Sequence, residues 1–312
     1  MATSTPLWPL ETHCICWKWP GERTSRWQKD RMLLLLYEAK SLFLHFSISK
    51  LGFLTPFSFS PNLRFGKKAA KVRIADFVHG SDGLGNQNFP PPQSKPIHLS
   101  APQFLVDQGN RYPGQVTVVA LGPLTNIALA IELDPSFPKK VGKIVLLGGA
   151  FGLNGNVNPA AEANIFGDPD AADIVFTSGA DVAAIGINVT HQVILTDEDR
   201  KQLGQCDGKL AQYLCKILEF YYSYHYEAYG IKGVYLHDPT VILAAIDPTV
   251  CTYTEGAVRV QTTGISKGLT ILYNQWKRYG EMHEWYDKPT VKVAVTVDAP
   301  RVVGIIMDRL LH

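Results

Sequence analysis

The chain has 312 residues and 46% of them are hydrophobic, which is enough to bury the core of one large α/β domain or of two smaller ones. Residues 1–70 hold ten Lys and Arg against four Asp and Glu, whereas residues 71–312 hold twenty against twenty-four, so the net charge of +2 conceals a basic N-terminal segment. The longer part has no basic cluster of the kind that contacts nucleic acid, and no apolar run is long and uninterrupted enough to span a bilayer. We therefore expect no nucleic-acid or membrane partner. Five scattered cysteines favour a reducing compartment, the cytosol.

The first 70 residues differ in character from the rest of the chain. They contain four of the six tryptophans and a Phe- and Ser-rich stretch at 41–68, without an alternation of strands and helices. One interpretation is an organellar transit peptide, because the segment is basic, contains serine and is poor in acids. The other, which we favour, is an atypical and poorly ordered leader, with the folded domain at 71–312.

From Val72 onward strands and helices alternate. Apolar, β-branched runs predict buried strands, and Asp168 as N-cap with Pro169 at the first helical position predicts a helix with a defined start. In chain order we predict a strand at 116–121, a helix at 127–133, a strand at 143–148, a helix at 168–179, a strand at 182–190, helices at 209–229 and 237–246, strands at 257–261 and 290–297, and a helix at 301–311. This alternation predicts an α/β fold with a mostly parallel sheet, helices on both faces, and a ligand at the carboxyl ends of the strands.

The stretch GNVNPAAEAN at 155–164 places Asn156, Glu162 and Asn164 after a predicted strand and a glycine-rich turn. Such side chains can cap nearby backbone groups, which is the commoner use of a single Asn. A mixture of amides and a carboxylate also supplies the donors and acceptors that hold vicinal hydroxyls, as on a sugar. We favour the sugar because all three fall at the expected ligand-binding edge.

His237 and Asp238 begin a predicted helix at the same edge. An Asp before Pro is a common N-cap, but a neighbouring His can act as a general acid and a carboxylate can bind Ca²⁺. The loop at 75–86 carries His79 among three glycines without the spacing of a phosphate-binding loop, so phosphate binding is not predicted.

An aromatic stretch, FYYSYHYEAYG at 220–230, lies on the predicted helix 209–229. Tyr222, Tyr226 and Tyr229 share one helical face, with His225 between them. Core packing explains this pattern, and so does an aromatic wall for a flat heterocycle.

These stretches together resemble the nucleoside hydrolases, the inosine–uridine-preferring N-ribohydrolases, and within them the plant uridine nucleosidases. The resemblance is carried by RIADFVHGSDGLGNQNFPPP at 73–92, ALGPLTNIALA at 120–130, the GN-x-x-P-x-AE-x-N-x-x-x-DP pattern within 144–176, and HDPTVILAAI at 237–246. It implies a Rossmann-like fold, hydrolysis of the N-glycosidic bond of ribonucleosides to ribose and free base, one Ca²⁺ ion and a homo-oligomer.

The resemblance also implies roles for the candidate residues. Ribose would be held by Asn156, Glu162 and Asn164, and the base would lie near His237, as proton donor, and His79. Ca²⁺ would be bound by Asp238 and by the backbone carbonyl of Leu121. The variable aromatic positions, among them Tyr222, Tyr226 and Tyr229 with His225, would line the base pocket, and they leave the preferred nucleoside open.

One part of the family pattern has no counterpart here. The family begins with a strand that ends in a D-x-D-x-G-x-D-D cluster, and this chain has only the scattered acids Glu11, Glu22, Asp30 and Glu38 before Lys71. We therefore predict a fold without its usual first strand, weak Ca²⁺ binding and little or no activity. The alternatives are a non-catalytic subunit partner and a ribose- or nucleoside-binding module.

Overall fold

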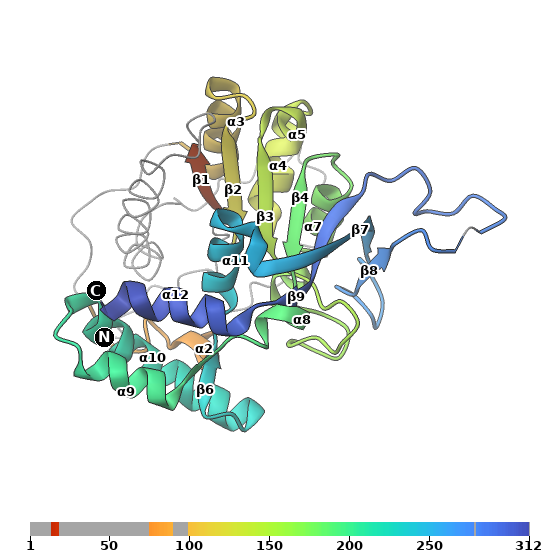
Figure 1. The fold of residues 1–312 in the computed structure, drawn as a ribbon. Helices are drawn as coiled ribbons and strands as arrows, with labels where there is room; N and C mark the ends of the chain where they lie inside the picture. Colours follow the sequence, from red (N-terminus) through yellow and green to blue (C-terminus); the bar gives the residue numbers. More distant parts are fainter. Residues whose placement is uncertain (1–13, 19–74, 90–98, 278, 312) are drawn as a thin grey trace, which may run out of the picture.

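The computed structural model describes residues 14–18, 75–89, 99–277 and 279–311, with the backbone alone for 14–18. Its centre is a seven-stranded sheet in the order β1-β2-β3-β4-β9-β7-β8 (Figure 1). The strands of this sheet are β1 Cys14–Lys18, β2 Val116–Ala120, β3 Lys143–Leu147, β4 Val182–Ile185, β7 Cys251–Val260, β8 Thr270–Tyr273 and β9 Val291–Val297. Two short strands, β5 Ile194–Thr196 and β6 Gly233–Tyr235, pair separately in antiparallel fashion.

The four central strands β2, β3, β4 and β9 run parallel, and the strands outside them are antiparallel. Parallel neighbours need crossover connections, and helices after β2 and β3 provide them. This arrangement brings the carboxyl ends of β2 and β3 to one edge of the sheet. The predicted mostly parallel sheet with helices is confirmed.

Helices cover both faces of the sheet. On β2, Val118 and Ala120 belong to one core cluster, while Val119 and the next residue after the strand, Leu121, belong to the other, so the strand is buried on both sides and its sequence is a continuous apolar run. The first cluster packs under α3 Ala101–Arg111, α4 Thr125–Leu133, α5 Phe137–Lys140 and α7 Pro169–Phe176. The second packs under α9 Asp197–Gln205, α10 Lys209–Tyr229, α11 His237–Ile246 and α12 Ala299–Leu311. The remaining short helices are α2 Asp76–His79, α6 Ala163–Gly167, α8 Ile187–Thr190 and the 3₁₀ turn Pro248–Val250.

Most predicted elements are present, but two strands differ in their bounds, and the one predicted at 257–261 begins already at Cys251, as β7. The bounds of α10 and α11 are those expected, and α7 begins after an Asp168 side chain that accepts from the Ala171 N–H. The predicted strand at 182–190, however, stops at Ile185, and α8 follows from Ile187. The β-branched residues after Gly186 resemble a strand in sequence, but in the structure they turn back into the core as a short helix.

The sheet edge beside β2 is occupied by β1, which pairs antiparallel from Cys14↔Ala120 to Lys18↔Val116. The sequence predicted no strand before residue 71. An edge strand presents unpaired backbone N–H and C=O groups that pair readily with another extended segment. The rest of the leader, and with it the prediction that residues 1–70 are poorly ordered, lies outside the described residues. In the part of the chain that the structure describes, no helix combines the length and hydrophobicity of a bilayer span.

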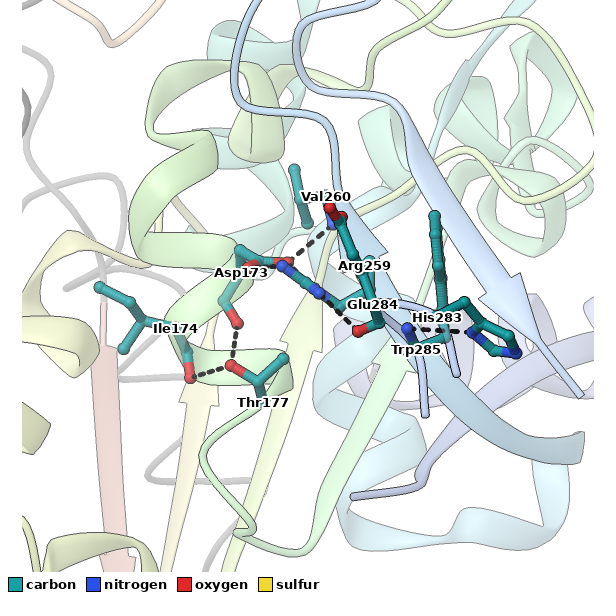
Figure 2. A network of polar contacts seen from close by, with 8 residues as sticks. All are labelled: Asp173, Ile174, Thr177, Arg259, Val260, His283, Glu284 and Trp285. Carbon is teal, nitrogen blue, oxygen red and sulfur yellow. Dashed lines mark hydrogen bonds and ion pairs between the residues drawn. The ribbon is translucent and has the colours of Figure 1, made fainter. Parts of the chain in front are cut away.

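A charged network ties α7 to the strand β7 and to the segment after β8 (Figure 2). The Asp173 carboxylate accepts from Arg259 Nε at 2.8 Å and Nη2 at 2.9 Å, and also from the Val260 N–H at 2.9 Å. Arg259 Nη1 donates to the Glu284 carbonyl at 2.8 Å. The two side chains are mostly buried, at 19% and 23% exposure, so this bidentate pair exceeds a surface salt bridge in strength.

We expect Asp173→Ala to lower the free energy of unfolding by about 2–3 kcal/mol, because it leaves the guanidinium and a backbone N–H without their acceptor. Asp181→Ala is the matched control: it breaks a 3.4 Å contact to Lys292 between half-exposed side chains and should cost less than about 1 kcal/mol. Urea unfolding midpoints at constant m-value measure both. Equal losses for the two variants would contradict this assignment.

Candidate active site

A pocket of about 690 Å³ lies at the carboxyl ends of β2 and β3. Figure 1 shows the elements that meet around this end of the sheet, with α2, α10 and β6 grouped on one side of it. Nine of the predicted site residues line the pocket: His79, Leu121, Asn156, Glu162, Asn164, His225, Tyr229, His237 and Asp238. Segments from residue 75 to residue 239 therefore converge on one cavity, as the parallel topology predicts.

Glu162 is buried, at 3% exposure, and its carboxylate is held by backbone N–H groups. It is the N-cap of α6, where it accepts from Asn164 N at 2.9 Å and Ile165 N at 3.1 Å, and it also accepts from Gly149 N at 3.2 Å. Burial, with a smaller contribution from nearby Asp238, raises the pKa of this carboxyl to about 7 against the effect of these hydrogen bonds. For Glu162, loop capping accounts for the contacts of both oxygens.

Asn156 and Asn164 have their amide orientations set by their partners. Asn156 Oδ1 accepts from Ala163 N at 2.9 Å, which leaves its Nδ2 donor for a ligand. Asn164 Nδ2 donates to the Leu147 carbonyl at 3.0 Å and approaches the Leu121 carbonyl at 3.4 Å, which leaves its Oδ1 acceptor for a ligand. One donor and one acceptor on the same loop form a complementary pair for adjacent hydroxyl groups.

Gly155 allows this loop to fold back tightly on itself. A Cβ at Gly155 would lie 2.1 Å from the Ala161 carbonyl oxygen, and Val157 N donates to that carbonyl at 3.2 Å. The loop that carries Asn156 and Asn164 therefore requires a residue without a side chain at this position.

We expect Gly155→Ala to displace this loop and to weaken binding of the expected nucleoside at least about fivefold, because the loss of one hydrogen bond is already worth about 1 kcal/mol. The control is Gly204→Ala, because no atom lies within 4 Å of a Cβ added at this position. This variant should change the free energy of unfolding by no more than about 1 kcal/mol. Uridine titration calorimetry with a thermal melt of each variant checks the effect. Wild-type affinity in Gly155→Ala would contradict it.

His237 and Asp238 enter the pocket from the first turn of α11. Asp238 is not the N-cap, because that position belongs to Leu236 and no side chain caps the helix, so the capping alternative is wrong here. Burial raises the pKa of the Asp238 carboxyl to about 6. Burial, followed by His191 and the other nearby histidines, lowers the pKa of the His237 imidazole to about 3.

The aromatic wall comes from α10, but only part of it was predicted correctly. Tyr222 is 6% exposed, and its hydroxyl donates to the carbonyls of Leu195 and Thr196, outside the pocket. Tyr226 is 61% exposed and does not line the pocket either, so both assignments are wrong.

Two tyrosines that the sequence prediction missed, Tyr221 and Tyr224, line the pocket beside His225 and Tyr229. The missed signal is the apolar stripe through Leu214 and Leu218, which continues at helical spacing into Tyr221 and His225. It identifies the helical face directed at the pocket better than the tyrosine spacing does.

His79 stacks on Tyr221, with ring centroids 5.7 Å apart and planes at 18°. The glycine-rich loop that follows is held by Asp82, whose carboxylate accepts from the N–H groups of Leu84, Asn86 and Asn88. The hydrogen bonds of this carboxylate therefore stabilise the turn. His79 lines the pocket together with Gly83 and Gly85 of this loop.

The comparisons with known proteins identify the family. The family profile described as inosine-uridine preferring nucleoside hydrolase matches residues 64–304. This chain belongs to that family. Probable uridine nucleosidase 2 of Arabidopsis thaliana is 71% identical over 242 residues, which cover 78% of this chain and 75% of that protein.

Solved structures agree with the assignment. The plant nucleoside hydrolase PpNRh1 has 56% identity and a TM-score of 0.76, over 77% of this chain and 76% of its own. The purine-preferring ribonucleoside hydrolase from Gardnerella vaginalis has 37% identity and a TM-score of 0.71, over 78% and 76%. By family, this nucleoside hydrolase is therefore a ribonucleoside-cleaving enzyme.

The described residues do not by themselves fit a calcium ion. Ca²⁺ takes about six to eight oxygen ligands. The family resemblance implies two calcium ligands, the Asp238 carboxylate and the Leu121 carbonyl oxygen, and both residues line the pocket. The Leu121 carbonyl oxygen is also within hydrogen-bonding reach of Asn164 Nδ2. Within residues 75–89, 99–277 and 279–311, no three His, Cys, Asp or Glu side chains are grouped so that they could hold a metal. The acids before Lys71 lie outside the described residues.

Proposed function

We propose that this nucleoside hydrolase binds uridine and related ribonucleosides in the pocket between β2, β3 and α10, and that the chain as printed cleaves them slowly or not at all. Uridine is the first candidate because the Arabidopsis relative is named as a uridine nucleosidase. The purine preference named for the Gardnerella vaginalis relative makes inosine the second substrate to test.

The observation that carries the proposal is the pair of oriented amides. Asn164 is anchored on the carbonyl of Leu147, at the end of β3, and Asn156 is anchored on Ala163 N, so neither side chain needs to reorganise to meet a ligand. Within the described part of the chain, the Asn156 Nδ2 donor and the Asn164 Oδ1 acceptor have no hydrogen-bond partner, and this pair suits the two adjacent hydroxyls of ribose. Tyr221, Tyr224 and Tyr229 supply flat apolar surface for the base.

We expect slow cleavage because the described residues support only two of the three requirements of the reaction. Breaking a sugar–base bond through an oxocarbenium-like state requires an oriented ribose, help for the leaving base and an activated water. The amide pair supports the first requirement and His237 the second. For the water, the Glu162 oxygens already accept backbone N–H groups, and among the described residues Asp238 and Glu162 have no third acid beside them that could complete a metal-binding group.

The binding half of this proposal is tested by calorimetry with uridine, 2′-deoxyuridine and 2′,3′-dideoxyuridine. Each removed hydroxyl leaves a polar group of the site without its partner, so we expect affinity to fall about tenfold or more from uridine to the dideoxy analogue. Equal affinity for all three ligands would contradict recognition of the ribose hydroxyls. No heat with uridine or inosine would contradict the nucleoside site altogether.

We also propose a homo-oligomer and a cytosolic location, on the strength of the family resemblance and the cysteine pattern. Size-exclusion chromatography with light scattering tests the first, and the distribution of the endogenous protein between cell fractions tests the second. A strictly monomeric protein would contradict the oligomer.

A further inference from the structure

Thr190 contacts His237, and none of the roles expected for the site residues accounts for this contact. It is the last residue of α8, it is fully buried, and its Oγ1 lies 2.7 Å from His237 Nδ1. The two residues are 47 positions apart in the chain. Because His237 lines the pocket and its Nδ1 faces Thr190, Nε2 is the ring nitrogen left to meet a ligand.

The surroundings of Thr190 determine which group is the donor in its hydrogen bond with His237 Nδ1. A hydroxyl can donate to an unprotonated Nδ1 or accept from a protonated one. Among the described residues, His237 Nδ1 is the one hydrogen-bond partner of the Thr190 side chain, and neighbouring His191 Nε2 has no partner at all. The hydroxyls of Thr177, directly after α7, and of Thr240, on α11, donate to the backbone carbonyls of Asp173 and Leu236, but the Thr190 hydroxyl does not donate to backbone among the described residues.

If Thr190 accepted a hydrogen bond from Nδ1, its own hydroxyl hydrogen would be buried without an acceptor, which carries the desolvation cost of an unsatisfied polar group. Donation to Nδ1 avoids this cost. It leaves Nδ1 without a hydrogen and places the single hydrogen of a neutral imidazole on Nε2.

We propose that Thr190 is a positioning residue that fixes His237 in its Nε2–H tautomer and so presents a hydrogen-bond donor to an acceptor atom of the nucleoside base. The inference rests on the proposed function for the identity of the ligand, but the tautomer itself is a property of the free protein. A carbonyl oxygen or an unprotonated ring nitrogen of a heterocycle is the chemical class of acceptor that fits. The wrong tautomer would direct a lone pair at that acceptor and repel it.

The tautomer is read directly by long-range ¹H–¹⁵N correlation spectra of the histidine rings, with His237 assigned by its absence in His237→Gln. We expect wild type to show a protonated Nε2 and an unprotonated Nδ1. Thr190→Ser keeps the hydroxyl and should preserve this pattern, while Thr190→Val keeps the shape and should shift the ring towards the Nδ1–H tautomer. Uridine affinity should fall about tenfold in Thr190→Val and change less than about twofold in Thr190→Ser, since one hydrogen bond is worth about 1.4 kcal/mol here.

A protonated Nδ1 in wild type would overturn the proposal, and so would an unchanged tautomer together with unchanged affinity in Thr190→Val. If Thr190→Val does not fold, the wild-type and Thr190→Ser spectra still decide the direction of the hydrogen bond. Failure of the proposed function would look different: the Nε2–H pattern would be present while uridine gives no binding heat.

Discussion

Asn164→Ala is expected to weaken uridine binding about 100-fold. The substitution removes the Oδ1 acceptor offered to the ribose, and it also removes the donor to the carbonyls of Leu147 and Leu121, so two hydrogen-bonding functions are lost at about 1.4 kcal/mol each. Calorimetric titration of the variant with uridine measures the loss.

A ligand and a variant serve as matched controls for this effect. The affinity for 2′,3′-dideoxyuridine, which lacks the hydroxyls, should change much less in Asn164→Ala than the affinity for uridine does. Asn110→Ala removes an amide that accepts from Lys140 on the surface, and it should leave uridine binding unchanged. An equal loss for both ligands would indicate that the loop has moved, and an unchanged uridine affinity would contradict the role of Asn164.

Phe176→Ala is expected to lower the free energy of unfolding by about 3–5 kcal/mol. Phe176 is the last residue of α7 and is fully buried in the cluster between that helix and the sheet, so truncation leaves a cavity in close-packed surroundings. Urea unfolding with an unchanged m-value measures the loss.

Leu133→Ala is the control for this prediction, since Leu133 ends α4 with 54% of its surface exposed and should cost less than about 1 kcal/mol. A small effect at Phe176 would contradict the close packing of α7 on the sheet. A comparable effect at both positions would contradict the layered core described for this face.

The sequence predicted well those features that depend on local pattern. The first turn of α7 was predicted from Asp168 and Pro169, and α11 was predicted at 237–246, because capping residues and apolar periodicity act within a few positions. The convergence of Asn164 and His237 on one edge followed from the parallel strand order, which places loops from distant segments together, whereas His79 was expected there only from the family resemblance.

Features set by tertiary packing were not predictable in this way. Which face of α10 meets the pocket depends on how the helix lies over the sheet, so spacing alone selected Tyr222 in place of Tyr221. The end of β4 at Ile185 and the pairing of β1 with β2 depend on neighbours far away in the chain. The contact between Thr190 and His237 joins two helices and has no local signal in the sequence.

The proposed function predicts a pocket that binds ribonucleoside but lacks the carboxylates for efficient hydrolysis. The most direct test is to incubate the purified chain with uridine and Ca²⁺ and to follow ribose release beside calorimetric binding in the same buffer. We predict saturable binding of uridine with ribose release at or near the level of a protein-free blank. Robust turnover that Asn164→Ala abolishes would contradict this.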